Sequence, residues 1–517
     1  MAKTKQDSKP LRLGPLVVKI IIMSLFASGL GYMMFVAFLA GENLIGGVLA
    51  LVLIASFVVY SSKGLVPLKF LLPGIVLLAV FVVTPILYTV LMSGFVYKTG
   101  NEISRDEALT QIYETGYVPD ESFTAFYMTL GRYEGQVSAL LTDQMSMTPY
   151  LGANGVATEL DANQVQLDEY GTAVGLDGFE PISFDEAATL EAEIIDLRFD
   201  MGEGKFIRPE SLDAALLMIQ AFTLDPATGE LYDSVNDITY VDNGEGNFVN
   251  KANPEEKLFP GWRAFSPLEN YVGLLTDPVI RGPFVNVFIW TFSFALITVV
   301  TMFAAGLALA IAMDKPLRFK RFYKSILILP YAIPSFMSIL IWNGMFNRDF
   351  GAVNQVLGAE IDWYNDATLA KLVIIIVNLW LGFPYFYLIS SGALQALPSE
   401  LEEAAAIDGA SPAQIMARIK LPLLLQILSP LLIASFAFNF NNFNIVYLLT
   451  NGGPINVLAG ETAGATDILI TYAYKTAFGS AEQNLGLASA ISVIMFFIVG
   501  GLSLWSLRRS KVLESVI

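Results

Sequence analysis

The sequence predicts an all-α polytopic membrane protein with eight transmembrane helices and one inserted soluble domain of mixed or β-rich structure. Hydrophobic residues make up 54% of the 517 residues, and charged residues only 15%. Uncharged runs such as residues 70–92 are long enough to cross the hydrocarbon core of a bilayer as helices. Residues 98–283, in contrast, carry 33 acidic and 10 basic side chains, a net charge of −23, and the rest of the chain nets +5, which together give −18. An acidic, water-exposed block is therefore embedded in a mildly basic membrane protein.

The apolar runs define the order of the elements. We expect the eight spans at residues 15–40, 44–62, 68–95, 284–313, 325–345, 369–392, 423–450 and 484–507. The first run is too long for the core of a signal peptide, so it is kept as a span. The predicted organisation is therefore an N-terminal part with three spans (1–95), the insertion (96–283), a core with five spans (284–507) that contains a loop at 393–422, and a short tail (508–517).

Orientation follows from the basic residues of the short loops, because lysine and arginine are retained on the cytoplasmic side of a membrane. Under the eight-span assignment, every basic cluster falls on one side. We therefore expect both termini and the 393–422 loop in the cytoplasm, and residues 96–283 outside. The clusters are Lys3, Lys5, Lys9 and Arg12; Lys63 and Lys69; Lys315, Arg318, Lys320, Arg321 and Lys324; Arg418 and Lys420; and Arg508, Arg509 and Lys511.

The insertion shows turn signals between short apolar runs, at Asn154-Gly155, at Asp177-Gly178 and within residues 242–244. Residues 184–197 have a helical pattern, and residues 231–241 a pattern more typical of strands. This is the basis for predicting a mixed or β-rich domain. Its function has two interpretations: a docking surface for an extracellular partner, or a solvated insertion that only aids folding. A large insertion at a single loop favours the first.

Catalysis by this chain is not expected. The sequence contains no cysteine and no histidine, which removes thiolate ligands, the commonest general base and the commonest metal ligand. No glycine-rich phosphate loop of the form GxxxxGK[ST] occurs either. We therefore predict a chain that is not an enzyme and that holds no metal or other cofactor.

The loop at 393–422 has the signals of two short helices. Ser399 followed by Glu402 is a capping-box pattern, and Gly409 is suited to ending that first helix. Ser411, Pro412 and Gln414 form a second start, and Pro422 is expected to limit the second helix.

The same loop carries a spaced motif. Residues 403–405 read Glu-Ala-Ala, Gly409 follows six residues after the glutamate, and Ile419-x-Leu421-Pro422 comes later. This spacing resembles the EAA motif of the ABC-importer permeases. The resemblance implies the type I permease fold, with this loop seated in a cleft of an ATPase subunit. It also implies that the ATPase-coupling residues are Glu403, Ala404, Ala405 and Gly409.

Three of the predicted spans carry polar and aromatic residues at intervals that place them on one helical face. One interpretation is hydrogen bonding between helices, which is common for asparagine in membranes. The other is a sugar site, because hydroxyls need donor–acceptor side chains and the apolar sugar faces rest on aromatic rings. Three such stripes favour the sugar site. The residues are Tyr331 and Ser335 in the fifth span; Asn378, Leu381, Gly382 and Tyr385 in the sixth; and Ser435, Phe438, Asn439 and Asn442 in the seventh.

Other polar and proline positions in these spans are assigned separately. Asn441 and Asn444 lie on the far side of a regular seventh helix, so we assign them to packing. Pro330 and Pro334 are expected to kink the fifth span near Tyr331 and open it toward a cavity. A purely structural kink is the alternative.

Local strings narrow the family further. Residues 327–336, 435–443 and 449–454 closely resemble the larger permease subunits of maltose/maltodextrin importers, as does the single large insertion after the third span. The resemblance implies that the ten cavity residues named above contact maltose or maltodextrin in the inner membrane of a bacterium. It implies as partners a smaller permease subunit of the MalG type, two copies of an ATPase subunit, a periplasmic maltose-binding protein and the lipid bilayer, but no nucleic acid.

Rival functions remain open at this point. The nearest is a permease for another oligosaccharide, such as trehalose or a galacto-oligosaccharide. An ion-coupled transporter would require acidic residues deep in the membrane, and spans four to eight have none at mid-depth. A membrane receptor would require a cytoplasmic signalling domain, for which only short loops and tails are available.

Overall fold

The computed structural model describes residues 13–62, 64–120, 124–202, 204–316, 318–455, 463–479 and 482–509. The chain forms two compact units: a helical unit of Met1–Val96 and Ser266–Ile517, and a soluble unit of Tyr97–Phe265. Six of the basic residues used to predict orientation lie outside the described residues: Lys3, Lys5, Lys9, Arg12, Lys63 and Lys511.

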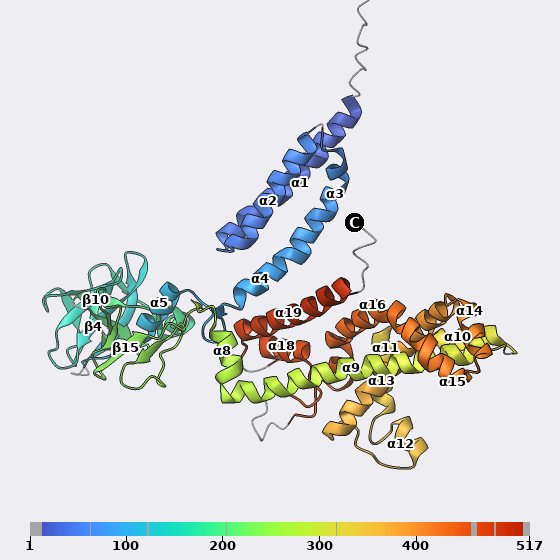
Figure 1. Ribbon diagram of the computed structural model, residues 1–517. Coiled ribbons are helices and arrows are strands. Elements are labelled where there is room, and N and C mark those ends of the chain that lie inside the picture. The colour runs from blue at the N-terminus through green and yellow to red at the C-terminus, as the bar shows by residue number, and fades with distance from the viewer. Residues whose placement is uncertain are drawn as a thin grey trace, which may run out of the picture. The chain divides into compact units, whose positions relative to one another are not determined.

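The N-terminal helices of the helical unit are long and apolar. They are α1 (Leu13–Leu39), α2 (Asn43–Ser61), α3 (Val66–Leu78), the π-helical turn η1 (Ala79–Val83) and α4 (Thr84–Met92), followed by the short strand β1 (Phe95–Val96). Helices α1 and α2 pack side by side (Figure 1). The π-turn accommodates Pro85 without ending the helix, and Thr84 Oγ1 donates to the Ala79 carbonyl at 2.8 Å. Residues 66–92 therefore form one span.

The permease core follows the soluble unit in sequence. Its helices are α8 (Glu269–Thr276), α9 (Pro278–Asp314), α10 (Lys320–Ala332), α11 (Ser335–Met345), α12 (Ala352–Leu357), α13 (Ala367–Gln395), α14 (Ser399–Ile407), α15 (Pro412–Ile415), the π-turn η2 (Met416–Lys420), α16 (Leu421–Phe440), α17 (Phe443–Leu449), α18 (Leu469–Phe478) and α19 (Leu485–Arg509).

Helices α9 and α13 form the centre of this core. They pack closely because Gly306 of α9 has no side chain: a Cβ there would lie 2.6 Å from the main-chain carbonyl carbon of Phe386 in α13. Small residues allow membrane helices to approach in this way. Gly382 of α13 similarly leaves room for Met302 of α9. These two glycines therefore set the short distance between α9 and α13.

The number of spans agrees with the sequence. Among the described residues, seven helices are long and apolar enough to cross a membrane, and the bent pair α10–α11 makes eight if it is counted as one span. Two spans differ in form from the prediction. The fourth begins at Pro278 rather than at 284, because Asp277 caps it through the Val279 amide at 2.8 Å. The seventh, expected as one helix over 423–450, is interrupted at residues 441–442.

The soluble unit is built mainly from β-strands, as predicted. Its strands are β2 (Tyr117–Pro119), β3 (Ala125–Tyr133), β4 (Gln136–Asp143), β5 (Pro149–Ala153), β6 (Val156–Glu159), β7 (Val165–Leu167), β8 (Ala173–Leu176), β9 (Phe179–Pro181), β10 (Phe199–Gly202), β11 (Lys205–Pro209), β12 (Ala214–Gln220), β13 (Phe222–Leu224), β14 (Leu231–Asp233), β15 (Ile238–Asp242), β16 (Phe248–Asn250) and β17 (Ala264–Phe265). Its helices are α5 (Arg105–Thr115), α6 (Phe184–Thr189) and α7 (Glu191–Ile195).

The largest sheet runs β2-β12-β11-β10-β6-β5-β4-β3-β9, and the additional pairing of β12 with β3 closes it on itself. A buried apolar cluster that includes Phe126, Phe199 and Ile207 fills it. A second sheet runs β13-β14-β15-β16 and buries Tyr240. Burial and the Glu256 carboxylate, which accepts the phenol hydrogen at 3.2 Å, raise the pKa of Tyr240 to about 12.

The local predictions for this unit are confirmed. The helical pattern at 184–197 contains α6 and α7, and the strand pattern at 231–241 corresponds to β14 and β15. The Asn154-Gly155 turn joins β5 to β6 with both residues at positive φ. Glycine tolerates that conformation without penalty, which is why the pair predicts a hairpin.

Candidate functional site

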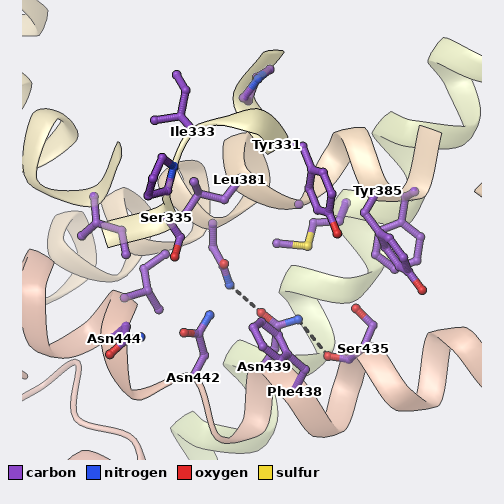
Figure 2. Close-up of a pocket in the computed structure, with 18 of the residues that line it drawn as sticks. Tyr331, Ile333, Ser335, Leu381, Tyr385, Ser435, Phe438, Asn439, Asn442 and Asn444 are labelled. Carbon is purple, nitrogen blue, oxygen red and sulfur yellow. Dashed lines mark hydrogen bonds between the residues drawn. The ribbon is translucent and has the colours of Figure 1, made fainter. Parts of the chain in front are cut away.

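A cavity of about 680 Å³ lies in the permease core, within the usual size range of small-molecule sites. It is lined by the α10–α11 bend and by α13, α16 and α17 (Figure 2). All ten residues predicted to form the substrate site lie on its wall: Tyr331, Ser335, Asn378, Leu381, Gly382, Tyr385, Ser435, Phe438, Asn439 and Asn442. The structure thus brings three stripes, predicted separately on three spans, around one space.

The first wall is made by a sharp bend rather than a mild kink. Helices α10 and α11 meet at 92°, with Ile333 in an extended conformation between them. Pro334 explains this, because proline disfavours a helical conformation in the preceding residue and has no N–H to donate. The expected opening of the fifth span is confirmed. Tyr331 and Ser335, on the two sides of the bend, both reach the cavity.

The second wall carries a hydrogen-bonded pair of amides. Asn378 Nδ2 of α13 donates to Asn439 Oδ1 of α16 at 2.7 Å, and Asn439 Nδ2 donates to the Ser435 carbonyl at 2.8 Å (Figure 2). Both asparagines are buried. An unpaired buried amide would cost roughly 2–7 kcal/mol, and the pairing removes much of that penalty. The two interpretations of these residues are therefore compatible, since the asparagines both join helices and line the cavity.

The break between α16 and α17 changes one assignment. Because the helix ends at Phe440 and restarts at Phe443, Asn444 is turned onto the cavity wall. Its assignment to packing is wrong, since it assumed one continuous helix. Asn441 is absent from the cavity lining, and its Nδ2 donates to the Ala437 carbonyl at 3.3 Å. The sequence signal for this break is the high density of asparagine in an apolar segment, with four asparagines among residues 439–444.

The loop at 393–422 forms two helical starts, as expected, but with a different first cap. Helix α14 begins at Ser399 itself, so its hydroxyl makes no cap and the predicted capping box with Glu402 does not form. Glu402 instead pairs with Lys420 Nζ at 2.5 Å. Gly409 ends the helix at φ +82°, and the Ser411–Gln414 capping box is present.

The second helix does not stop at Pro422. The π-turn η2 widens the helix just before this proline, which relieves the clash with the preceding turn, and the chain continues into α16. Residues 412–440 therefore form one continuous helical path from the loop to Asn439 at the cavity. The expected limit at Pro422 is wrong for this reason. Glu403, Ala404 and Gly409 are exposed, whereas Ala405 is half-buried.

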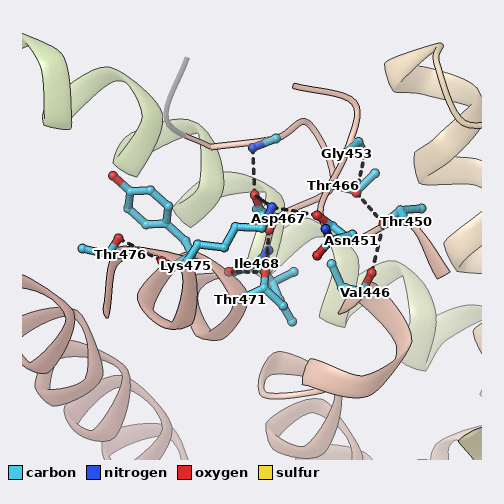
Figure 3. Close-up of polar contacts among 12 residues, drawn as sticks. Val446, Thr450, Asn451, Gly453, Thr466, Asp467, Ile468, Thr471, Lys475 and Thr476 are labelled. Atoms are coloured by element: carbon cyan, nitrogen blue, oxygen red, sulfur yellow. Dashed lines mark hydrogen bonds and ion pairs between the residues drawn. The ribbon is translucent and has the colours of Figure 1, made fainter. Parts of the chain in front are cut away.

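A second polar cluster, not predicted from the sequence, fixes the segment after α17. Asp467 is buried, pairs with Lys475 Nζ at 2.8 Å, and accepts from Thr471 Oγ1 at 2.9 Å (Figure 3). Lys475 also donates to the Asn451 carbonyl at 2.7 Å. The cluster ties the start of α18 to the turn that ends α17, and so holds α17, which carries Asn444 and begins directly after Asn442.

Comparison with known proteins places the chain in a family. A sequence profile described as "Binding-protein-dependent transport system inner membrane component" matches residues 302–509. The maltose/maltodextrin transport system permease protein MalF of Vibrio vulnificus (strain YJ016) is 34% identical over 503 residues, covering 94% of this chain and 93% of its own length. The chain belongs to the MalF family.

Other members have comparable similarity. MalF of Escherichia coli (strain K12) is 33% identical and covers 95% of this chain, and 96% of its own length is matched. Among solved structures, a chain of a bacterial ABC transporter involved in the import of the acidic polysaccharide alginate matches 47% of this chain and 82% of its own length, at 18% identity and a TM-score of 0.40. The chain is a multi-pass permease subunit of an ABC importer, as its MalF relatives are.

Proposed function

We propose that this chain is the permease subunit that binds and conducts sugar in a maltose/maltodextrin importer of a bacterial inner membrane. The observation that carries the proposal is the cavity, which combines amides, hydroxyls and aromatic rings contributed by three spans. The names of its MalF relatives indicate the substrate.

The cavity is suited to sugar on both polar and apolar sides. Phe438 and Tyr331 are 69% and 58% exposed, so much of each ring is open to lie against the apolar faces of pyranose rings. The Asn378 and Asn439 amides retain donors and acceptors beyond the bond between them. Sugar hydroxyls, which both donate and accept, match such groups.

Energy for transport enters through partners in this proposal. Helix α14 buries none of its residues, and Ile407 on it is 87% exposed, so the helix is available to seat in another protein. We assign ATP hydrolysis to two copies of an ATPase subunit that contact Glu403, Ala404, Ala405 and Gly409. Movement of this contact would reach Asn439 through the continuous helical path of residues 412–440.

The remaining partners complete the cycle. A smaller permease of the MalG type closes the other side of the pathway, and a periplasmic maltose-binding protein delivers the sugar. Both termini face the cytoplasm in this arrangement, and the domain at 96–283 faces the periplasm. The basic residues of the short loops support that orientation. The net charge of −23 over residues 98–283 supports a water-exposed domain.

The test is uptake of labelled maltose into proteoliposomes that contain the complete complex, the binding protein and ATP. Asn439→Ala should abolish uptake while the complex still assembles, because it removes the amide that joins two cavity walls. Glu403→Ala should lower maltose-stimulated ATP hydrolysis without changing the cavity. Uptake of trehalose or a galacto-oligosaccharide in place of maltose would keep the importer and replace its substrate. Uptake without any ATPase subunit would overturn the proposal.

A further inference from the structure

Two amides at one end of the cavity are uncommitted. Within the part of the chain that the structure describes, the side chains of Asn442 and Asn444 make no hydrogen bond, although both line the cavity. Asn378 and Asn439, by contrast, are bonded to each other. Asn442 even occupies the N-cap position of α17 without capping it. A capping bond there typically contributes about 1 kcal/mol, so leaving this amide free forgoes a local stabilisation.

The free amides continue a row of polar residues. Ser435, Asn439, Asn442 and Asn444 follow one another along the α16–α17 wall, with Asn444 at the end farthest from Ser435 (Figure 2). Ser435 and Asn439 lie four residues apart in α16, roughly 6 Å at the helical rise of 1.5 Å per residue, whereas Asn442 lies in the break after α16 and Asn444 in α17. Along the α16–α17 wall, Asn444 therefore lies beyond Asn442, the last of the predicted residues on that wall. Ser335 faces this end from the α11 side (Figure 2).

We propose that Asn444 is a specificity-determining residue that binds the hydroxyls of a further sugar unit at this end of the cavity. An asparagine amide offers two donors and a carbonyl acceptor, which match a pair of adjacent sugar hydroxyls. A two-ring sugar is held by the row that ends at Asn442, and a third ring reaches Asn444. The residue thus favours longer α-glucans over disaccharides. The proposal rests on the proposed function, because it assumes that the cavity holds maltodextrin.

The test compares maltotriose with maltose in proteoliposomes that contain the complete complex and saturating, sugar-loaded binding protein. Asn444→Leu keeps the size of the side chain and removes the amide. Because the binding protein is identical in every sample, a change in the maltotriose-to-maltose uptake ratio reports the cavity. Loss of one or two neutral hydrogen bonds should lower this ratio about 2- to 10-fold. Asn441→Leu is the matched control, since its amide bonds the Ala437 carbonyl instead, and its ratio should stay at the wild-type value.

A second variant covers the case in which leucine disturbs assembly. Asn444→Ser retains one hydroxyl and should lower the ratio in the same direction by a smaller factor. A wild-type ratio in the assembled serine or leucine variant, or equal loss of uptake for both sugars, would overturn the role of Asn444. Wild-type complex that transports neither glucan would instead overturn the proposed function, and the role of Asn444 with it.

Discussion

Replacement of Lys475 by methionine should destabilise the permease core strongly. The variant removes the only ion-pair partner that Asp467 has within the described residues, and Asp467 is 0% exposed. Two bonds to the carboxylate would remain, from the Gly464 amide at 2.7 Å and the Thr471 hydroxyl at 2.9 Å. Removal of one partner from a buried ion pair typically costs 3–5 kcal/mol, because the other charge is left uncompensated. These remaining bonds place the expected loss near the lower end, at about 3 kcal/mol.

The assay is equilibrium unfolding of the purified chain in mixed micelles, followed by tryptophan fluorescence. Trp290 is a local reporter, since its Nε1 donates to the Thr466 carbonyl at 3.2 Å beside the pair. Lys371→Met is the control: this lysine lies 4.7 Å from the centre of the Trp290 ring and makes no ion pair within the described residues, so about 0.5–1 kcal/mol is expected. A double replacement of Lys475 with methionine and Asp467 with asparagine should cost less than Lys475→Met alone. Equal losses for Lys475→Met and Lys371→Met would refute the reasoning.

Two further predictions concern the loop and the soluble unit. The Glu402–Lys420 ion pair joins α14 to the helical path into α16, so reversing the charge of either residue alone should lower the number of sugar molecules transported per ATP hydrolysed. Exchanging the two charges should restore much of that ratio; no recovery in the exchanged variant would contradict this. In the soluble unit, the pKa of Tyr240 is about 12 when the chain is folded and near 10 when it is unfolded. The unfolded state therefore loses the phenol proton first, and the free energy of unfolding should fall as the pH rises from 10 to about 12. Tyr240→Phe should remove this pH-dependent loss of stability, which is measured as the difference between the unfolding free energies of variant and wild type at each pH. Ionisation of Tyr240 in the folded chain at pH 10, detected by tyrosinate absorbance, would count against the prediction.

Much of the permease core could be predicted from local patterns. Charge-free runs located the spans because the hydrocarbon core demands about 20 consecutive apolar residues of any helix that crosses it. The cavity residues could be found because residues three or four apart share a helical face, which applies within α13 and along α16. The helix end at Gly409 and the Ser411–Gln414 capping box could also be recognised, because each signal involves residues only a few positions apart in the sequence.

The predictions that were wrong depended on contacts or continuity beyond the local pattern. The sequence predicts that Pro422 ends a helix, but the π-turn before it provides the space that the ring needs. Glu402 fitted a capping box, but its carboxylate pairs with Lys420, which lies on another helical segment. Helical periodicity predicts Asn444 on the far side of an unbroken helix, but the break at residues 441–442 turns it into the cavity.

The sequence by itself determined the membrane class, the order of the spans, the inserted acidic domain and the faces that line the cavity, because hydropathy and helical periodicity are local properties of the chain. Only the tertiary structure decided which polar groups are satisfied and which are free. The Asn378–Asn439 bond joins residues 61 positions apart, and the Asp467–Lys475 pair also bonds Asn451. A buried polar group finds its partner through packing, and packing distances between separate helices are not encoded in any short stretch of sequence.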